Sequence, residues 1–185
     1  MKYFRPENQR QLFDLLAEFS PAKRTLLAGG TDLMPRYENG LSLPENLIDL
    51  KKISDFIGIT EADTEIVIGS LTSIETLKNS SLIHDHFHAL WQATNQFAGV
   101  QIRHRATLGG NICNASPAGD TLPALYAHEA SVRLISSSSQ SELPIGDFIT
   151  GPGTTALRKG EILQAVILPK RSGFSTFYKL GLRQA

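Results

Sequence analysis

Two segments of the chain combine paired glycines with hydroxyl and amide side chains. The first covers residues 26–32 and reads Leu-Leu-Ala-Gly-Gly-Thr-Asp, and the second covers residues 107–120 and contains Gly109-Gly110. Paired glycines permit positive φ angles and close approach of the backbone to a ligand, and successive free N–H groups form a concave site for phosphate. Either segment alone is explained more simply by a tight turn. The two together favour a ligand that carries two phosphate groups.

The second segment adds side chains suited to a nucleotide. Its hydroxyl and amide groups are those of Thr107, Asn111, Asn114 and Ser116, and Asp120 can accept a hydrogen bond from a sugar hydroxyl or a ring N–H. A long irregular stretch is uncommon in a compact domain unless function maintains it, although a solvated loop is the alternative. The first segment has neither the lysine of a P-loop nor the spacing of the Rossmann fingerprint, so neither motif is predicted.

The elements that hold the first segment follow from hydrophobic periodicity. Apolar residues at helical spacing predict a helix over residues 8–19, and a short buried strand over 25–28 leads into the paired glycines. A short helix is expected from Thr31 or Asp32, followed by a strand over 46–50. The first 50 residues are therefore expected to form a β-α-β unit with a glycine-rich crossover.

The rest of the chain is expected to mix antiparallel strands with helices. Thr72 and Glu75 have the spacing of a capping box, which predicts a helix start at that point. The expected elements are hairpin strands over 57–60 and 65–69, a helix over 82–98, an irregular segment over 107–120, a helix over 122–126, and strands over 130–135, 143–145, 162–168 and 174–179.

Composition narrows the class of protein. The 185 residues contain 41% hydrophobic and 19% charged residues, which is ordinary for a soluble globular protein. The 18 basic and 18 acidic residues balance, so no nucleic acid or anionic membrane is indicated as a partner. No secretory signal and no membrane span is expected. The single cysteine, Cys113, excludes an internal disulfide and a cysteine-only iron–sulfur site, and it fits a reducing cytoplasm.

The two glycine segments, taken with others, resemble the flavin subunits and domains of the molybdenum hydroxylase family, which includes xanthine dehydrogenase and carbon monoxide dehydrogenase. The similarity covers essentially the whole chain, and its most specific part is Ala-Gly-Gly-Thr-Asp combined with Thr-Leu-Gly-Gly-Asn-Ile. The matching segments are residues 3–6, 28–32, 97–103, 107–112 and 151–179.

This resemblance implies a fold and its organisation. The implied fold class is α+β, a two-subdomain FAD-binding domain of the vanillyl-alcohol-oxidase (PCMH) type and not a Rossmann domain. We expect a small FAD-binding subdomain over residues 1–55 and a larger α+β subdomain over residues 56–185. Relatives continue into a further domain after the segment that matches residues 179–183, and that C-terminal domain is expected to be absent here.

The resemblance also implies which residues hold the cofactor. Both glycine segments would wrap the pyrophosphate of FAD, Phe97 and Leu163 would bracket the adenine, and Asp120 and Lys179 would lie at the flavin ring. Phe97 and Leu163 are equally explained as core residues. The full implied set is Leu26, Leu27, Ala28, Gly29, Gly30, Thr31, Asp32, Phe97, Thr107, Gly110, Asn111, Asn114, Ser116, Asp120, Leu163 and Lys179.

The implied activity is that of an oxidoreductase flavin subunit. A molybdopterin-binding large subunit would oxidise the substrate, a small subunit with [2Fe–2S] clusters would relay the electrons, and FAD would pass them to NAD or another acceptor. The FAD is expected to be non-covalent, since no attachment pattern is present. The alternative, from another class, is a non-catalytic FAD-binding or assembly module.

Two other groups of residues are candidates for chemistry. His84, His86 and His88 alternate around Asp85 and could suggest zinc, but residues two apart on a helix diverge, so a solvated helix start is the simpler interpretation and no metal is expected. Cys113 is interpreted as a packing residue and not a nucleophile, because no histidine–carboxylate set accompanies it.

Overall fold

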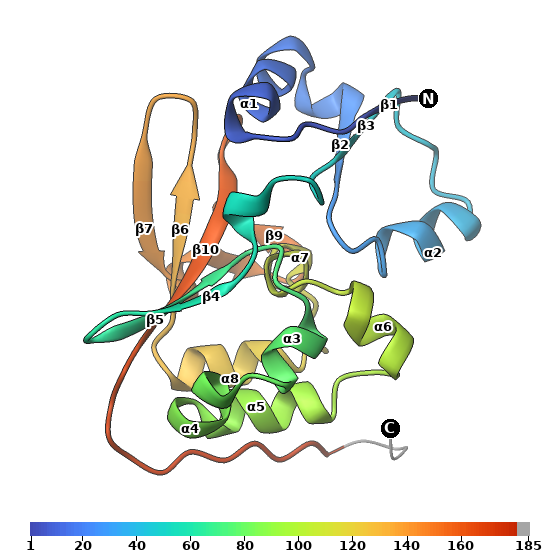
Figure 1. Ribbon diagram of the computed structural model, residues 1–185. Helices are drawn as coiled ribbons and strands as arrows, with labels where there is room; N and C mark the ends of the chain where they lie inside the picture. The colour runs from blue at the N-terminus through green and yellow to red at the C-terminus, as the bar shows by residue number, and fades with distance from the viewer. Residues whose placement is uncertain (181–185) are drawn as a thin grey trace.

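The N-terminal part of the chain forms a parallel three-stranded sheet in the computed structural model, which describes residues 1–180 (Figure 1). Its strand order is β1-β3-β2, so the middle strand, β3, is buried along its length. The strands are β1 (Lys2–Phe4), β2 (Arg24–Leu27) and β3 (Asn46–Asp49).

Two helices accompany this sheet. Helix α1 (Gln9–Glu18) begins where the Asn8 side chain accepts a hydrogen bond from the Gln11 N–H at 3.0 Å, and it buries Leu12 and Leu16. Helix α2 (Leu33–Glu38) follows the first glycine segment and connects β2 to β3. The expected β-α-β unit with a glycine-rich crossover is therefore confirmed.

An antiparallel five-stranded sheet forms the other part of the molecule, in the order β4-β5-β10-β6-β7. The central strand, β10, consists mainly of Ile, Leu and Val, as expected of a strand buried on both faces. The strands are β4 (Ile59–Glu61), β5 (Glu65–Gly69), β6 (Ser131–Ile135), β7 (Gln140–Pro144) and β10 (Ile162–Pro169).

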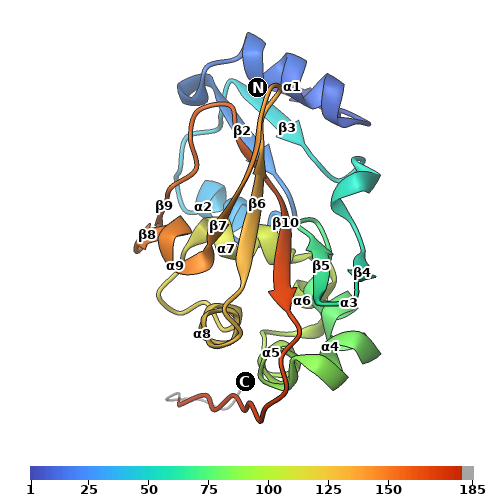
Figure 2. The ribbon, with the colours of Figure 1, turned by 90° about the vertical axis from the view of Figure 1, so that its left-hand side faces the viewer.

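Short helices pack against this sheet, with α4, α5 and α8 farthest from the N-terminal sheet in both views, whereas the start of α7 faces the loop after β2 (Figures 1 and 2). These helices are α3 (Ile74–Lys78), α4 (Ser81–His86), α5 (His88–Asn95), α6 (Val100–Arg105), α7 (Leu108–Asn114), α8 (Thr121–Ala127) and α9 (Ile145–Phe148). The remaining elements are the 3₁₀ turns η1 (Pro21–Lys23) and η2 (Ser54–Phe56) and the hairpin strands β8 (Ile149–Gly151) and β9 (Thr154–Thr155).

The two parts of the molecule share apolar contacts. One buried cluster lies between the five-stranded sheet and its helices. A second cluster joins Leu12 and Ile48 of the N-terminal part to Leu71, Ile135 and Ile162 of the other part. The division into two subdomains at residue 55 stays a prediction, because this second cluster contains residues from both sides of that boundary. Residues 181–185, which the prediction includes in the larger subdomain, lie outside the described residues.

Three local expectations about helices are wrong. The Thr72 hydroxyl does not cap a helix but is buried and bonded to the backbone of Gly58, and Ser73 caps α3 instead by accepting from the Thr76 N–H. The helix expected over 82–98 is interrupted at Phe87, whose backbone leaves helical geometry between α4 and α5. The irregular segment expected over 107–120 contains helix α7.

Two expectations about strands are also corrected. Strand β7 ends at Pro144, and Ile145 starts helix α9 and does not continue the strand. Residues 174–179 do not form a strand, because their backbone pairs with no other strand of residues 1–180. They run extended past α5 instead, held by side chains such as Gln92, whose Oε1 accepts from the Phe177 N–H at 2.7 Å.

Candidate cofactor-binding site

A cleft of about 310 Å³ lies where the two glycine segments meet. The loop after β2 forms one side and the start of α7 forms the other, so the cleft lies between the parallel three-stranded part and the antiparallel five-stranded part of the molecule. Its lining residues are Leu26, Leu27, Ala28, Gly29, Gly30, Thr31, Asp32, Leu33, Leu50, Ser70, Leu71, Phe97, Ala106, Thr107, Gly109, Gly110, Asn111, Cys113, Asn114, Leu157, Ile162 and Leu163.

The first glycine segment needs glycine at both of its paired positions. Gly30 has φ of +77°, a left-handed conformation that side chains rarely adopt. A Cβ on Gly29 would lie 2.0 Å from the backbone oxygen of Arg105, so this loop packs directly on the chain ahead of the second segment. Within residues 1–180, the N–H groups of residues 29–32 donate no hydrogen bond. Four successive free N–H groups at a cleft are suited to an anion.

The base of this loop is fixed by a buried carboxylate. Asp49, with its side chain 3% exposed, accepts from the Lys51 ammonium at 2.7 Å and from the Tyr3 hydroxyl at 2.5 Å. Burial raises the pKa of the Asp49 carboxyl, but the hydrogen bonds from Lys51 and Tyr3 outweigh burial and leave the pKa below its ordinary value. The Lys51 ammonium also donates to the Ala28 oxygen at 3.3 Å, so the ion pair holds the start of the loop.

The paired glycines of the second segment lie in the first turn of α7. Thr107 caps this helix, because its hydroxyl accepts from the Gly110 N–H at 3.1 Å. A Cβ on Gly109 would lie 2.6 Å from the Cβ of Ser70, so Gly109 is needed for packing. A Cβ on Gly110 would lie 3.7 Å from the Cβ of Ala28, so Gly110 faces the first segment across the cleft.

The remaining wall of the cleft is apolar. Phe97 is partly buried and packs against the main core, while Leu163 and Ile162 come from the centre of the large sheet. An apolar wall that includes one aromatic ring is suited to a flat heterocycle.

One cation links the two sides at the mouth of the cleft. The Arg36 guanidinium pairs with the Asp32 carboxylate at 2.7 Å and donates to the Asn114 side-chain oxygen at 2.9 Å. Asp32 and Asn114 both line the cleft, whereas Arg36 lies just outside its lining. The guanidinium is therefore placed to compensate negative charge that enters between the glycine segments.

The structure brings most of the residues predicted for the site together. All seven residues from 26 to 32 line the cleft, as do Phe97 and Leu163. From the second segment, the lining includes Thr107, Gly110, Asn111 and Asn114.

Three predicted residues lie outside the cleft lining. Ser116 lines a separate shallow hollow beside Tyr126. Asp120 and Lys179 form an ion pair of 2.8 Å between their side chains, although 59 positions separate them in the chain. The neighbouring Thr121 hydroxyl donates to the Asn111 side-chain oxygen at 2.6 Å, so the Asp120–Lys179 pair lies next to the second glycine segment.

Sequence reasoning missed part of the lining. Gly109 lines the cleft but was not predicted to, although the glycine pair to which it belongs is visible in the sequence. Ser70, Leu71 and Leu157 carry no local signal, because tertiary packing alone brings them to the cleft. The interpretation of Cys113 as a packing residue is wrong, since its side chain is exposed and lines the cleft.

Two further properties concern the described part of the chain. Within residues 1–180, no three His, Cys, Asp or Glu side chains gather as metal ligands, and His84 pairs with Asp85 while His88 stacks on Trp91. Across the same residues, no helix is long and apolar enough to cross a membrane.

Comparison with known proteins identifies the family. Residues 1–171 match the family described as the FAD binding domain in molybdopterin dehydrogenase. The chain is 32% identical over 189 residues to the nicotinate dehydrogenase FAD-subunit of Eubacterium barkeri, covering 100% of this chain and 64% of the relative. It is 34% identical to the xanthine dehydrogenase FAD-binding subunit of Escherichia coli O157:H7, covering 99% of this chain and 63% of that one.

Solved structures agree with this assignment. A carbon monoxide dehydrogenase from Hydrogenophaga pseudoflava superposes with a TM-score of 0.93 at 28% identity, over 100% of this chain and 64% of that one. The α+β fold of the PCMH type is thereby confirmed, and the chain spans less than two thirds of the length of these relatives. The chain belongs to the family of FAD-binding domains in molybdopterin dehydrogenases, and FAD is its cofactor.

Proposed function

We propose that this chain is the electron-transfer module of a molybdopterin-dependent hydroxylase or dehydrogenase. In this role it takes electrons from the [2Fe–2S] clusters of a partner subunit and delivers them to NAD or another acceptor. The observation that carries the proposal is the meeting of both glycine segments at one cleft, in a chain of this family. Bound FAD supplies the redox chemistry, and the protein supplies binding, orientation and charge.

The residues of the cleft fit the adenosine diphosphate half of FAD. The free N–H groups of residues 29–32 and the Arg36 guanidinium offer hydrogen bonds and positive charge to a diphosphate. Phe97 and Leu163 offer an apolar wall to the adenine. A volume of about 310 Å³ is at the low end for ligand sites, so the cleft is assigned to this half of the cofactor alone.

The flavin half is assigned to the side of the second segment where Asp120 and Lys179 pair. The Lys179 side chain is 34% exposed, and the Asp120 side chain is 16% exposed. A cation held at this point favours negative charge on a nearby reduced flavin ring by Coulomb attraction. Asp120 keeps that cation in place and can accept a hydrogen bond from a ring N–H.

The other redox centres are assigned to partner subunits. With Cys113 as its only cysteine, the chain has no set of cysteines for an iron–sulfur cluster. Relatives include proteins named as the medium chain of carbon monoxide dehydrogenase, a name that implies other chains in that assembly. We accordingly propose a molybdopterin-binding large subunit and a [2Fe–2S] small subunit as partners.

A second candidate function is a binding or assembly module that holds FAD without accepting electrons by itself. Both functions predict the same cleft occupant and differ only in electron transfer.

The proposal is tested on the purified full chain. Flavin absorbance bands close to stoichiometric with protein, as purified or after reconstitution, support FAD binding, whereas a protein that stays colourless contradicts it. Acid precipitation should release the yellow colour to the supernatant, as a non-covalent cofactor requires. Anaerobic addition of NADH should bleach the flavin bands if NAD is the acceptor, and unbleached flavin that dithionite does reduce would favour another acceptor or the second candidate.

A further inference from the structure

Helix α6 connects the aromatic wall of the cleft to the second glycine segment. Phe97 lies three residues before the helix, and Thr107 lies two residues after it. Arg103 is the one residue of this helix that is buried, at 8% exposed, while the other five are exposed. A short helix with a single buried side chain depends on that side chain for its orientation.

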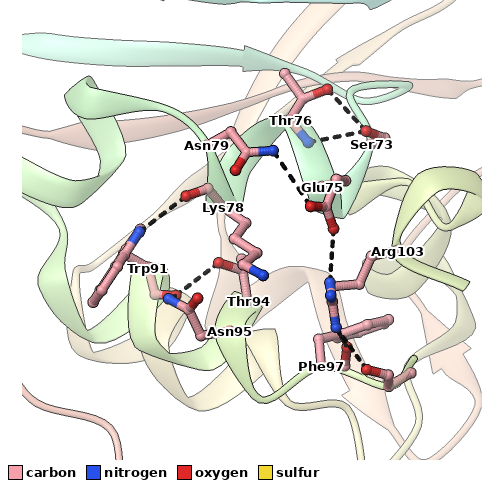
Figure 3. Close-up of polar contacts among 11 residues, drawn as sticks. Ser73, Glu75, Thr76, Lys78, Asn79, Trp91, Thr94, Asn95, Phe97 and Arg103 are labelled. Atoms are coloured by element: carbon pink, nitrogen blue, oxygen red, sulfur yellow. Dashed lines mark hydrogen bonds and ion pairs between the residues drawn. The ribbon is translucent and has the colours of Figure 1, made fainter. Parts of the chain in front are cut away.

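The Arg103 guanidinium makes three hydrogen bonds (Figure 3). Its Nε donates to the Glu75 carboxylate of α3 at 2.7 Å, and its Nη1 donates to the backbone oxygens of Phe97 and Ala98 at 3.1 and 2.8 Å. The guanidinium therefore fixes the turn that carries Phe97 relative to α3. Hydrogen bonds that involve a charged, buried group are the strong ones.

The turn held by Arg103 has an unfavourable backbone conformation. Ala98 has φ of +36°, in the left-handed region, where a Cβ is crowded against the backbone. Such a conformation persists when surrounding contacts fix it, and here Arg103 bonds the carbonyl groups on both sides of the turn.

The other end of α6 also reaches the cleft. The backbone oxygen of Arg105 is the atom against which Gly29 packs, and Ala106 lines the cleft. The orientation of α6 therefore determines both the position of Phe97 and the support of the first glycine segment.

We propose that Arg103, itself held by Glu75, is a positioning residue that fixes the Phe97 wall and so sets the affinity of the cleft for the adenine end of FAD. This inference rests on the proposed function, because it takes the cleft to hold the adenosine half of the cofactor. Neither residue lines the cleft, and of the two residues whose backbone oxygens Arg103 bonds, Phe97 lines the cleft and Ala98 does not, so the direct route from Arg103 to the ligand runs through Phe97.

A double-mutant cycle between Arg103 and Phe97 tests the inference. The dissociation constant of FAD is measured by fluorescence titration of the full chain. Arg103→Lys keeps the charge but cannot bridge the carboxylate and both carbonyl groups, so it should raise the dissociation constant about tenfold. In the Phe97→Ala background the same change should raise it no more than about twofold.

Arg133→Lys is the matched control. Arg133 and Glu142 form an ion pair of 2.8 Å across β6 and β7, away from the cleft lining, and the change should leave FAD affinity unaltered. Glu75→Gln weakens the same network without altering Arg103, and it carries the test if circular dichroism shows Arg103→Lys to be unfolded. We expect Glu75→Gln to raise the dissociation constant of FAD about threefold, and we expect no such rise in the Phe97→Ala background.

The outcomes distinguish failure of the positioning role of Arg103 from failure of the proposed function. Equal effects of Arg103→Lys or Glu75→Gln in both backgrounds, or no effect in a folded variant, would overturn the positioning role. A wild-type chain that binds no FAD would contradict the proposed function itself.

Discussion

The paired glycines of α7 have separate tasks at the residue scale. Gly110 faces the cleft, and a methyl group at that position would lie 2.8 Å from the Thr107 hydroxyl, which must rotate and weaken its cap. A lost cap costs about 1 kcal/mol, which a folded domain tolerates. We expect Gly110→Ala to raise the dissociation constant of FAD at least about tenfold, in a protein whose circular dichroism spectrum is unchanged.

Gly109→Ala is the matched variant, because its methyl group would lie 2.6 Å from the Cβ of Ser70, whereas a methyl group on Gly110 points toward Ala28 of the first segment. Crowding of this kind destabilises a folded protein by about 1–3 kcal/mol. The midpoint of urea unfolding should therefore fall further for Gly109→Ala than for Gly110→Ala. A Gly110→Ala protein that retains full FAD affinity would argue against the second segment as a cofactor contact.

The Asp49 carboxylate predicts an acid-sensitive contribution to stability. Its folded-state pKa lies below the unfolded value of about 3.9, so its contribution is present above that pH and declines as the pH falls toward the folded pKa. Asp49→Asn should lower the free energy of unfolding by about 1–3 kcal/mol at pH 7. The difference from wild type should shrink below about pH 4 in urea titrations; a constant difference would contradict the assignment.

At the element scale, α7 shows where local sequence patterns fail. Two glycines and two asparagines in seven residues are poor helix formers, so the segment is expected to be irregular. The helix exists because Thr107 caps it and because Gly109 permits contact with Ser70. The loop after β2, in contrast, was predictable, since a short apolar strand and Gly30 specify it locally.

Residues 174–179 show the opposite error, because their sequence predicts a strand and the structure has none there. Their sequence alternates like a strand because the Phe177 side chain packs against the core, the Ser175 hydroxyl accepts from the Ala89 N–H and Lys179 pairs with Asp120. Phe174 and Tyr178 are 90% and 82% exposed. Alternation records which side is covered and does not say whether a neighbouring strand is present. The pairing of Lys179 with Asp120 was likewise accessible only through family resemblance, because no local spacing relates positions so far apart.

The extended segment 170–180 should open locally. Gln92 Oε1 accepts from the Phe177 N–H and the Thr176 hydroxyl, so Gln92→Ala removes two of the bonds that hold it. At about 1 kcal/mol for each bond, or about 2 kcal/mol for both, trypsin cleavage after Arg171 should become roughly thirtyfold faster, measured by mass spectrometry. Gln96→Ala is the control, since that exposed side chain makes no hydrogen bond within residues 1–180; equal rates in both variants would contradict this account.

At the scale of the whole molecule, the cleft joins parts that fold around different sheets. The loop after β2 belongs to the parallel sheet, whereas Phe97, α7 and β10 belong to the antiparallel part, and the apolar cluster through Ile48 and Ile162 already connects them. A ligand in this cleft contacts both parts and binds only when they are correctly assembled. FAD should consequently stabilise the molecule as a unit against unfolding.

This coupling gives a quantitative expectation for thermal unfolding. At free FAD about 100 times its dissociation constant, the gain is about 2.7 kcal/mol, which corresponds to a rise in Tm of roughly 5–10 °C for a chain of this size. ADP should produce a rise as well, because the cleft is assigned to the adenosine diphosphate half, whereas FMN at the same concentration should do so weakly. With its dissociation constant raised about tenfold, the Gly110→Ala protein should gain only about 1.4 kcal/mol at the same FAD concentration, which is about half of the wild-type rise in Tm. If FMN stabilises the chain as strongly as ADP does, the assignment of the cleft to the adenosine half is wrong.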